Sequence, residues 1–152
     1  ELLKLGARVN DTTYDGWTAL MMATRDNYID PLNIINLLLK NKANVNAKSD
    51  RGVTALICAA YMRWTEQEEP IIHALLKAKA DVKAEDENGM TPLINAAWHN
   101  INPKVIDALI DAKSDVNHKD KNGFRAIDYA RENVVIRNTE TFTRLEKLSS
   151  KK

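Results

Sequence analysis

The sequence has few of the residues that usually mark a disulfide-stapled, metal-bound or membrane-spanning protein. Its single cysteine, Cys58, cannot form a disulfide within the chain and does not by itself indicate a metal site. Its 22 basic residues are balanced by 21 acidic residues, which leaves little positive charge to attract nucleic acid. No apolar run approaches the ~18–20 residues that a transmembrane helix needs. These absences exclude a disulfide framework and a membrane span, and they argue against a nucleic-acid partner.

What is present is typical of one ordinary globular domain. The chain has 152 residues, of which 44% are hydrophobic and 28% charged, so neither disorder nor low complexity is expected. It opens at Glu1 without an initiator methionine or a leader, which is consistent with a removed targeting peptide or with a start inside a longer product. The compartment is therefore left open.

Glycine is scarce, but its placement is regular. Of the five glycines, four open a similar short segment, and they stand 36, 37 and 34 residues apart. The four segments are Gly16-Trp17-Thr18-Ala19-Leu20, Gly52-Val53-Thr54-Ala55-Leu56, Gly89-Met90-Thr91-Pro92-Leu93 and Gly123-Phe124-Arg125-Ala126-Ile127. A second signature, seen as Leu38-Leu39…Ala43-Asn44-Val45-Asn46, recurs at a similar period. Two interleaved signals at one period indicate a repeat array.

Each unit of the array is predicted to consist of a turn, a first helix, a loop and a second helix. Clusters such as Asp86-Glu87-Asn88-Gly89 are turn chemistry, and the Ala-rich segment 91–98 suits a helix that packs closely on its neighbours. The second helix carries aliphatic side chains at i, i+1, i+4 and i+5, as in Ile71-Ile72…Leu75-Leu76. No unit can bury such a stripe alone, so stacked units must share one core.

These residues resemble ankyrin repeats over essentially the whole chain. The family pattern has a period of 33 residues, with a Gly-x-Thr-Pro-Leu-His start and a Leu-Leu-x-x-Gly-Ala-Asp-Val-Asn ending. Thr18, Thr54 and Thr91 keep the family threonine. The resemblance implies an all-α ankyrin-repeat solenoid of stacked turn-helix-loop-helix units with a C-terminal capping repeat.

The sequence departs from the family pattern at two positions of the unit. The family histidine is replaced, in chain order, by Met21, Ile57, Ile94 and Asp128. The glycine after the second helix remains only as Gly6, and its other places are taken by Lys42, Lys79 and Lys113. If the backbone there is left-handed, each lysine costs ~1–2 kcal/mol. Alternatively, that junction differs from the family's.

The two signatures divide the chain into repeats. We expect the end of a truncated repeat at 1–10, full repeats at 11–46, 47–83 and 84–117, a cap at 118–148 and a tail at 149–152. Because the array begins in a second helix, we expect a cap or further repeats upstream. The last helix is predicted over 139–148, with Phe142, Leu145 and Leu148 facing inward and polar residues outward.

The residues in excess of the family period fall between the first and second helices, at 27–33, 63–70 and 100–104. Asp30-Pro31 and Asn102-Pro103 predict an N-cap followed by proline at the first helical position. In the middle insertion, either Thr65 and Glu68 form a capping box or the helix begins at Pro70. Trp64 in the same insertion is either a lid over the helices or a second contact point.

No catalytic site, metal site or cofactor is predicted. The three histidines lie in unrelated contexts, and none is spaced to bind zinc with another histidine or with Cys58. Cys58 is expected as a packed thiol, and the acidic stretch 66–69 as a solvated loop. Asp128 is expected to accept hydrogen bonds from turn backbone rather than to act as a tuned acid. No phosphate-binding loop or nucleophile motif occurs, so the protein is not expected to be an enzyme.

The ankyrin resemblance implies a binding face on the concave side, formed by the turn tips and the outer ends of the first helices. Carried over to this sequence, the partner-binding set is Tyr14, Asp15, Trp17, Arg25, Asp50, Arg51, Tyr61, Met62, Glu87, Met90, Trp98, His99, Lys121 and Phe124. Aromatic residues and arginine dominate interface hot spots. Of these residues, Tyr61 and Trp98 are favoured as contacts. Trp17, Met90 and Phe124 share one slot with Val53, so they either contact the partner or pack on each other as a seam.

The predicted function is therefore non-catalytic binding of a protein or peptide on this face, by a monomer without a cofactor. One alternative is that the segment is the scaffold part of a larger enzyme or effector whose activity lies elsewhere. Another is a structural array that associates through its ends.

Overall fold

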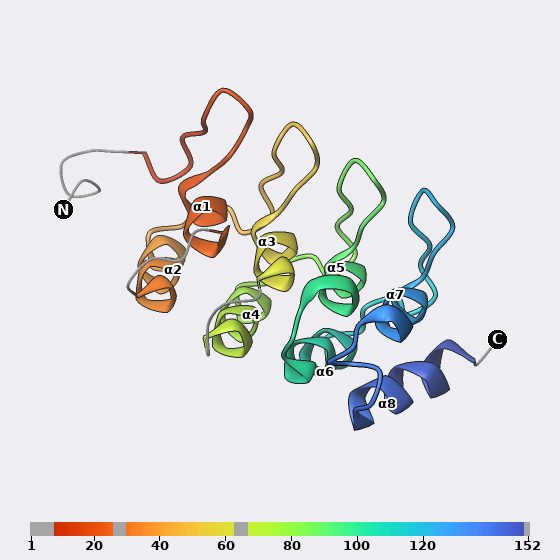
Figure 1. The fold of residues 1–152 in the computed structure, drawn as a ribbon. Helices are drawn as coiled ribbons and strands as arrows, with labels where there is room; N and C mark the ends of the chain where they lie inside the picture. Colours follow the sequence, from red (N-terminus) through yellow and green to blue (C-terminus); the bar gives the residue numbers. More distant parts are fainter. Residues whose placement is uncertain (1–7, 26–29, 63–66, 151–152) are drawn as a thin grey trace.

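The computed structural model describes residues 8–25, 30–62 and 67–150. Within that part of the chain, eight helices follow one another as four pairs (Figure 1). The first members of the pairs are α1 (Ala19–Arg25), α3 (Ala55–Tyr61), α5 (Pro92–His99) and α7 (Ala126–Glu132). The second members are α2 (Pro31–Lys40), α4 (Glu68–Lys77), α6 (Pro103–Asp111) and α8 (Glu140–Ser149).

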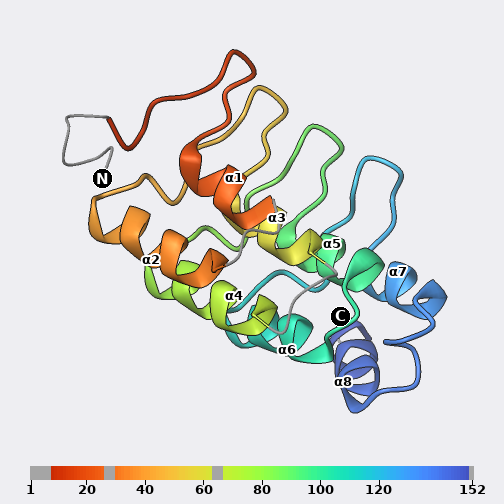
Figure 2. The ribbon, with the colours of Figure 1, turned by 60° about the vertical axis from the view of Figure 1, so that its left-hand side comes forward.

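The pairs stack side by side, so that the helices form two layers (Figures 1 and 2). In one layer α1 packs on α3, α3 on α5, and α5 on α7; in the other α2 packs on α4, α4 on α6, and α6 on α8. Long loops rise from one end of the first layer, away from the helices. This arrangement confirms the predicted all-α solenoid with units of turn, helix, loop and helix.

The first helices are short and contain several alanines, and three of the four, α1, α3 and α5, begin at the family threonine. The side-chain oxygens of Thr54 and Thr91 accept hydrogen bonds from the backbone N–H of Ile57 and Ile94, both at 3.3 Å. These bonds satisfy amide groups that the start of a helix leaves without a partner. Ala59, like the other small residues of α3 and α5, is fully buried, because small side chains let neighbouring helices approach closely.

The predicted aliphatic stripes form the core between the layers. Ile71, Ile72 and Leu75 of α4 are fully buried. On α2 the stripe is only partly covered: Ile35 is buried, but Ile34 is 38% exposed. The reason is that α4 packs between α2 and α6, whereas among the described helices of its layer α2 contacts only α4.

The first residue of a second helix was predicted for α2 and α6, and the structure agrees with both predictions. Asp30 and Asn102 are the N-caps of α2 and α6, and a proline follows each of them. The sequence left the start of α4 open between two alternatives. The helix begins at Glu68, with Gln67 at the N-cap and no side-chain cap hydrogen bond, so the alternative start at Pro70 is wrong and Pro70 lies in the first turn. Thr65 and Trp64, on which the other expectations for this insertion rest, lie outside the described residues.

The residue after the C-cap of each of α2, α4 and α6 has a left-handed backbone conformation. Lys42, Lys79 and Lys113 have φ angles of 66°, 65° and 67°. The N–H of Lys79 donates to the carbonyl of Leu76 at 2.9 Å and that of Ala80 to Leu75 at 3.0 Å, the paired bonds of a Schellman motif. The junction therefore keeps a backbone that favours glycine, and each lysine costs ~1–2 kcal/mol.

The last helix, α8, has the inward and outward faces that were predicted for a capping repeat. Leu145 of α8 is fully buried, and Phe142 and Leu148 pack against the core, while Thr143, Glu146 and Lys147 are exposed. Arg144 forms ion pairs with Asp107 and Asp111 of α6, which fasten α8 to the preceding unit.

Candidate partner-binding face

The loops before the first helices form four fingers, at 13–17, 49–53, 86–90 and 120–124, each closed by a backbone hydrogen bond between its ends. Neighbouring fingers are also joined: the N–H of Asp50 donates to Asp15 O at 3.1 Å, and that of Glu87 to Arg51 O at 2.8 Å. Gly52 has a φ of 73°, and a Cβ added there would lie 2.9 Å from the carbonyl oxygen of Glu85, the residue just before the next finger. Glycine is therefore required for this close approach.

Five aromatic rings make a continuous row across the last three units. We call these residues, Tyr61, His99, Trp98, Tyr129 and Phe124, the aromatic row. Adjacent ring centres are 4.3 Å apart from Tyr61 to His99, 4.3 Å from His99 to Trp98, 4.8 Å from Trp98 to Tyr129 and 5.8 Å from Tyr129 to Phe124. Tyr61, Trp98 and Phe124 remain 52%, 48% and 51% exposed. Each exposed ring of the row therefore packs against a neighbouring ring, which holds it in place.

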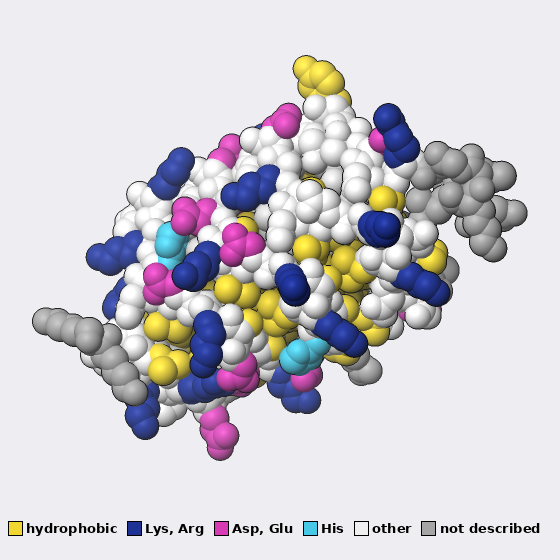
Figure 3. Space-filling view, turned by 180° about the vertical axis from the view of Figure 1, so that it is seen from behind, with side chains coloured by type: hydrophobic (Ala, Val, Ile, Leu, Met, Phe, Trp, Pro, Cys, Tyr) yellow, Lys and Arg dark blue, Asp and Glu magenta, His cyan; other side chains and the backbone are white. Residues whose placement is uncertain are grey.

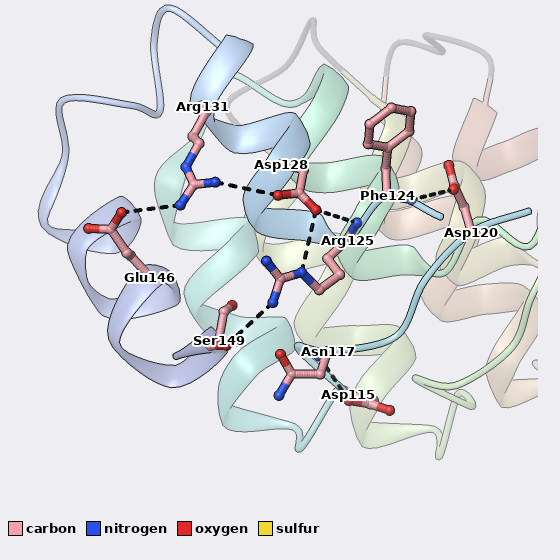
Figure 4. A network of polar contacts seen from close by, with 9 residues as sticks. All are labelled: Asp115, Asn117, Asp120, Phe124, Arg125, Asp128, Arg131, Glu146 and Ser149. Carbon is pink, nitrogen blue, oxygen red and sulfur yellow. Dashed lines mark hydrogen bonds and ion pairs between the residues drawn. The ribbon is translucent and has the colours of Figure 1, made fainter. Parts of the chain in front are cut away.

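A hydrogen bond between Tyr129 and Asp120 ties the last finger to α7. The Tyr129 hydroxyl donates to Asp120 Oδ2. Asp120 Oδ1 accepts from the N–H of Phe124 at 2.9 Å, a bond drawn in Figure 4. Burial and this hydrogen bond raise the pKa of Tyr129 to about 12. Burial raises the pKa of Asp120, but the Tyr129 hydroxyl and the Phe124 N–H outweigh it, so that this pKa is lowered overall. Phe124 and Tyr129 are therefore held in place by a charged acceptor.

Asp128, at the family histidine position, caps α7. Its Oδ2 accepts from the Arg125 backbone N–H at 2.9 Å, and its Oδ1 lies 3.5 Å from Arg131 Nη1 (Figure 4). Burial raises the pKa of Asp128, but the Arg125 N–H and the two arginines lower it further than burial raises it. Arg131 also lies 3.4 Å from Glu146 of α8. The expectation that Asp128 accepts bonds from turn backbone is confirmed.

Two asparagines hold the helix ends that carry the row. Asn100 Nδ2 donates to the carbonyls of Ala60 at 3.2 Å and Met62 at 2.8 Å. Asn133 Nδ2 donates to the carbonyls of Ala97 at 3.1 Å and Asn100 at 2.9 Å. The last carbonyls of a helix have no partner within it. These bonds therefore fix the ends of α3 and α5, where the row begins.

A pocket of about 340 Å³ opens beside the row, between the first and second fingers and the helices below them. Its lining residues are Trp17, Arg25, Val53, Ile57, Cys58, Tyr61, Met62, Asp86 and Asn95. The Arg25 guanidinium carbon lies 4.4 Å from the centre of the Trp17 ring, so the two side chains form one wall together. The lining is mostly apolar, with one basic and one acidic side chain, Arg25 and Asp86. We call this the concave pocket.

A family model described as ankyrin repeats, in three copies, matches residues 1–86 and 61–145. The chain belongs to the ankyrin-repeat family. The resemblance drawn from the glycine and Leu-Leu signatures is thereby confirmed. A search of curated proteins gives no match. Ankyrin repeats are generally protein–protein interaction modules and are typically non-catalytic.

Two further observations concern other kinds of site on this ankyrin-repeat protein. Across residues 8–25, 30–62 and 67–150, no helix combines the length and apolarity needed to cross a bilayer. In the same ranges, three or more His, Cys, Asp or Glu side chains nowhere gather in a way that could hold a metal ion.

Most of the predicted contact residues of the ankyrin-repeat protein lie on the surface. The exposed ones are Tyr14, Asp15, Arg25, Asp50, Arg51, Tyr61, Glu87, Trp98, Lys121 and Phe124, and Trp17 and His99 are half-buried. Met62 and Met90 were misplaced by the sequence analysis, because they are only 4% and 5% exposed. Both side chains pack into the hydrophobic core. Met90 therefore offers no surface contact, whereas Met62 can be reached only through the concave pocket that it helps to line.

Three residues of this face were not predicted from the sequence: Cys58, Asn95 and Tyr129. Each of them is the sixth residue after the glycine of a finger. Helical spacing was the available signal, because this position lies three residues before the slot of Arg25, Tyr61 and Trp98 and so shares its side of the helix.

Proposed function

We propose that this ankyrin-repeat protein binds a protein or peptide partner along the aromatic row and the concave pocket. The observation that carries the proposal is the row itself: three half-exposed rings lie in one line across successive units. Monomeric proteins seldom expose contiguous apolar surface without a use for it. Tyrosine and tryptophan are also the residues most enriched among interface hot spots.

The order of the row supports tight binding. Each ring rests on a neighbour, and Tyr129 is fixed further by its bond to Asp120. Rings that are already ordered lose little conformational entropy when a partner covers them, so more of the contact energy is left for affinity.

The concave pocket supports an apolar anchor on the partner. Trp17, Val53 and Ile57 are among its apolar lining residues, and Arg25 and Asp86 add one basic and one acidic side chain. A leucine, methionine or phenylalanine side chain of the partner is apolar and matches such a lining. The remaining exposed residues of the predicted set would then surround the contact.

The test is affinity capture from a lysate of the source, comparing the wild-type protein with a Tyr61→Ser/Trp98→Ser variant. Captured partners are then purified and titrated against both proteins. We expect the double variant to keep its helical circular dichroism and to bind at least ~100-fold more weakly, which corresponds to ~3 kcal/mol. Val134→Ser is the matched control, because Val134 is an exposed apolar residue outside the row.

Equal capture by both proteins would show that the row is not the contact. Loss of the helical signal in the double variant would show instead that the rings support the fold, and Trp98→Phe, which keeps an aromatic ring in the stack, would then be used to measure affinity.

A further inference from the structure

A second pocket lies apart from the aromatic row, between α6 and α8. Its volume is about 570 Å³, and it is lined by Ile110, Asp111, Lys113, Ser114, Val116, Arg144, Lys147 and Leu148. None of these residues belongs to the aromatic row or to the concave pocket. Seen from behind, the molecule has a band of hydrophobic side chains with Lys and Arg side chains along it (Figure 3). We call this site the α6–α8 pocket.

The lining of the pocket carries more positive than negative charge, with Lys113, Arg144 and Lys147 against Asp111. Arg144 is held by ion pairs with Asp107, at 2.8 Å, and with Asp111. Lys113 and Lys147 form no ion pair with any residue in the described ranges. Two ammonium groups are therefore left at the rim of a pocket whose lining includes Ile110, Val116 and Leu148. An anion that also carries an apolar group complements both features.

The next residue, Ser114, adds an unused hydroxyl. The corresponding position is alanine in the two earlier units, Ala43 and Ala80. Ser114 is 9% exposed, and its Oγ has no hydrogen-bond partner in the part of the chain that the structure describes. Its backbone N–H is already used, donating to Leu109 O at 3.2 Å. Rotation about its Cα–Cβ bond changes the direction of the hydroxyl without moving the backbone.

Lys113 lines this pocket although its backbone conformation favours glycine. Its φ of 67° favours glycine, which would remove the strain and also the charge. Strained residues of this kind cluster at functional sites. Lys42 and Lys79 share the conformation but do not line the α6–α8 pocket, so they serve as matched controls for the strain alone.

We propose that the α6–α8 pocket binds a carboxylate borne on a short aliphatic group. Lys113 and Lys147 attract the carboxylate, Ser114 donates to one of its oxygens, and the aliphatic part rests on Ile110, Val116 and Leu148. A polypeptide ending in leucine, isoleucine or valine presents this chemistry, because its carboxylate and apolar side chain leave the same Cα. A medium-chain fatty acid presents it as well, and the experiment distinguishes the two sources.

The probes are N-acetyl-Gly-Gly-Leu with a free carboxylate, the same peptide as its C-terminal amide, and octanoate. Each is titrated into the 15N-labelled chain at low salt, and the backbone amide shifts are followed. We expect the free acid to shift the Lys113, Ser114 and Leu148 signals and to bind ~10-fold more tightly than the amide. Octanoate binding without peptide binding would overturn the polypeptide source and support the fatty-acid source. Equal affinity for acid and amide would overturn the carboxylate site.

Variants separate ligand binding from folding. Lys113→Gly should raise the melting temperature and weaken binding of the free acid ~5–10-fold, whereas Lys79→Gly should raise the melting temperature and leave that affinity unchanged. Ser114→Ala should weaken binding ~3-fold or more without loss of stability, because it restores the residue of the earlier units. Unchanged affinity in Lys113→Gly would overturn the proposal. The Tyr61→Ser/Trp98→Ser variant should bind these probes normally, so this site and the proposed function can fail independently.

Discussion

Lys79 follows α4 with a φ of 65°, a conformation in which the Cβ crowds its own backbone. Glycine avoids that contact, although it also gives the unfolded chain more freedom. We expect Lys79→Gly to stabilise the protein by ~1 kcal/mol and to raise the melting temperature by ~2–4 °C in thermal denaturation. Lys79→Ala is the control: it keeps the Cβ and should give no such gain. If Lys79→Gly leaves the melting temperature unchanged, the positive φ of Lys79 does not strain the backbone.

The pKa of Tyr129, about 12, lies above the ordinary value of 10.0. Because the folded state holds this proton more tightly than the unfolded state, the resulting stabilisation is complete below pH 10 and is lost as the pH rises toward 12. We expect the urea midpoint to fall between pH 9.5 and pH 11.5 by more in wild type than in Tyr129→Phe, which has no such proton. Equal falls in both proteins would mean that the bond to Asp120 contributes nothing.

At the scale of elements, the ends of α3 and α5 depend on Asn100, which is fully buried. Asn100→Ala removes the donor to the Ala60 and Met62 carbonyls. Because Ala60 and Met62 are both buried at the end of α3, we expect a loss of ~2–4 kcal/mol in the free energy of unfolding, measured with urea. Asn88→Ala, in an exposed finger, is the control and should change stability by less than ~0.5 kcal/mol. A loss as small as that of the control would show that water replaces the missing donor.

The helix starts show how far local chemistry predicts an element. Asp30 and Asn102 could be recognised because a capping side chain and a following proline are both local signals. The start of α4 could not be recognised in this way, because its N-cap residue, Gln67, makes no side-chain cap hydrogen bond. The left-handed turn at Lys42 was predictable only as an alternative, since lysine itself gives no sign of positive φ.

At the scale of the whole molecule, the fold followed from the repeat period, but the aromatic row did not. Trp17 and Met90 occupy the same slot, yet Met90 is buried and Trp17 is half-buried. Tyr129 meets Trp98 only because α7 lies against α5, a contact between units that no single repeat specifies. Burial and ring contacts across units are properties of the stack, and a slot-by-slot comparison of the sequence does not contain them.

The two ends of the described stack differ in a way that bears on association. On α2, Leu37 is 52% exposed, whereas the outer face of α8 carries Thr143, Glu146 and Lys147. Stacking one chain's α2 against another's α8 would bury the two charged groups against an apolar side chain, which is unfavourable. We therefore expect a monomer, with a mass in sedimentation equilibrium that is constant from ~5 to ~200 μM, a range that covers weak association. A mass that rises with concentration in wild type but not in Leu37→Ser would overturn this and place the contact at α2.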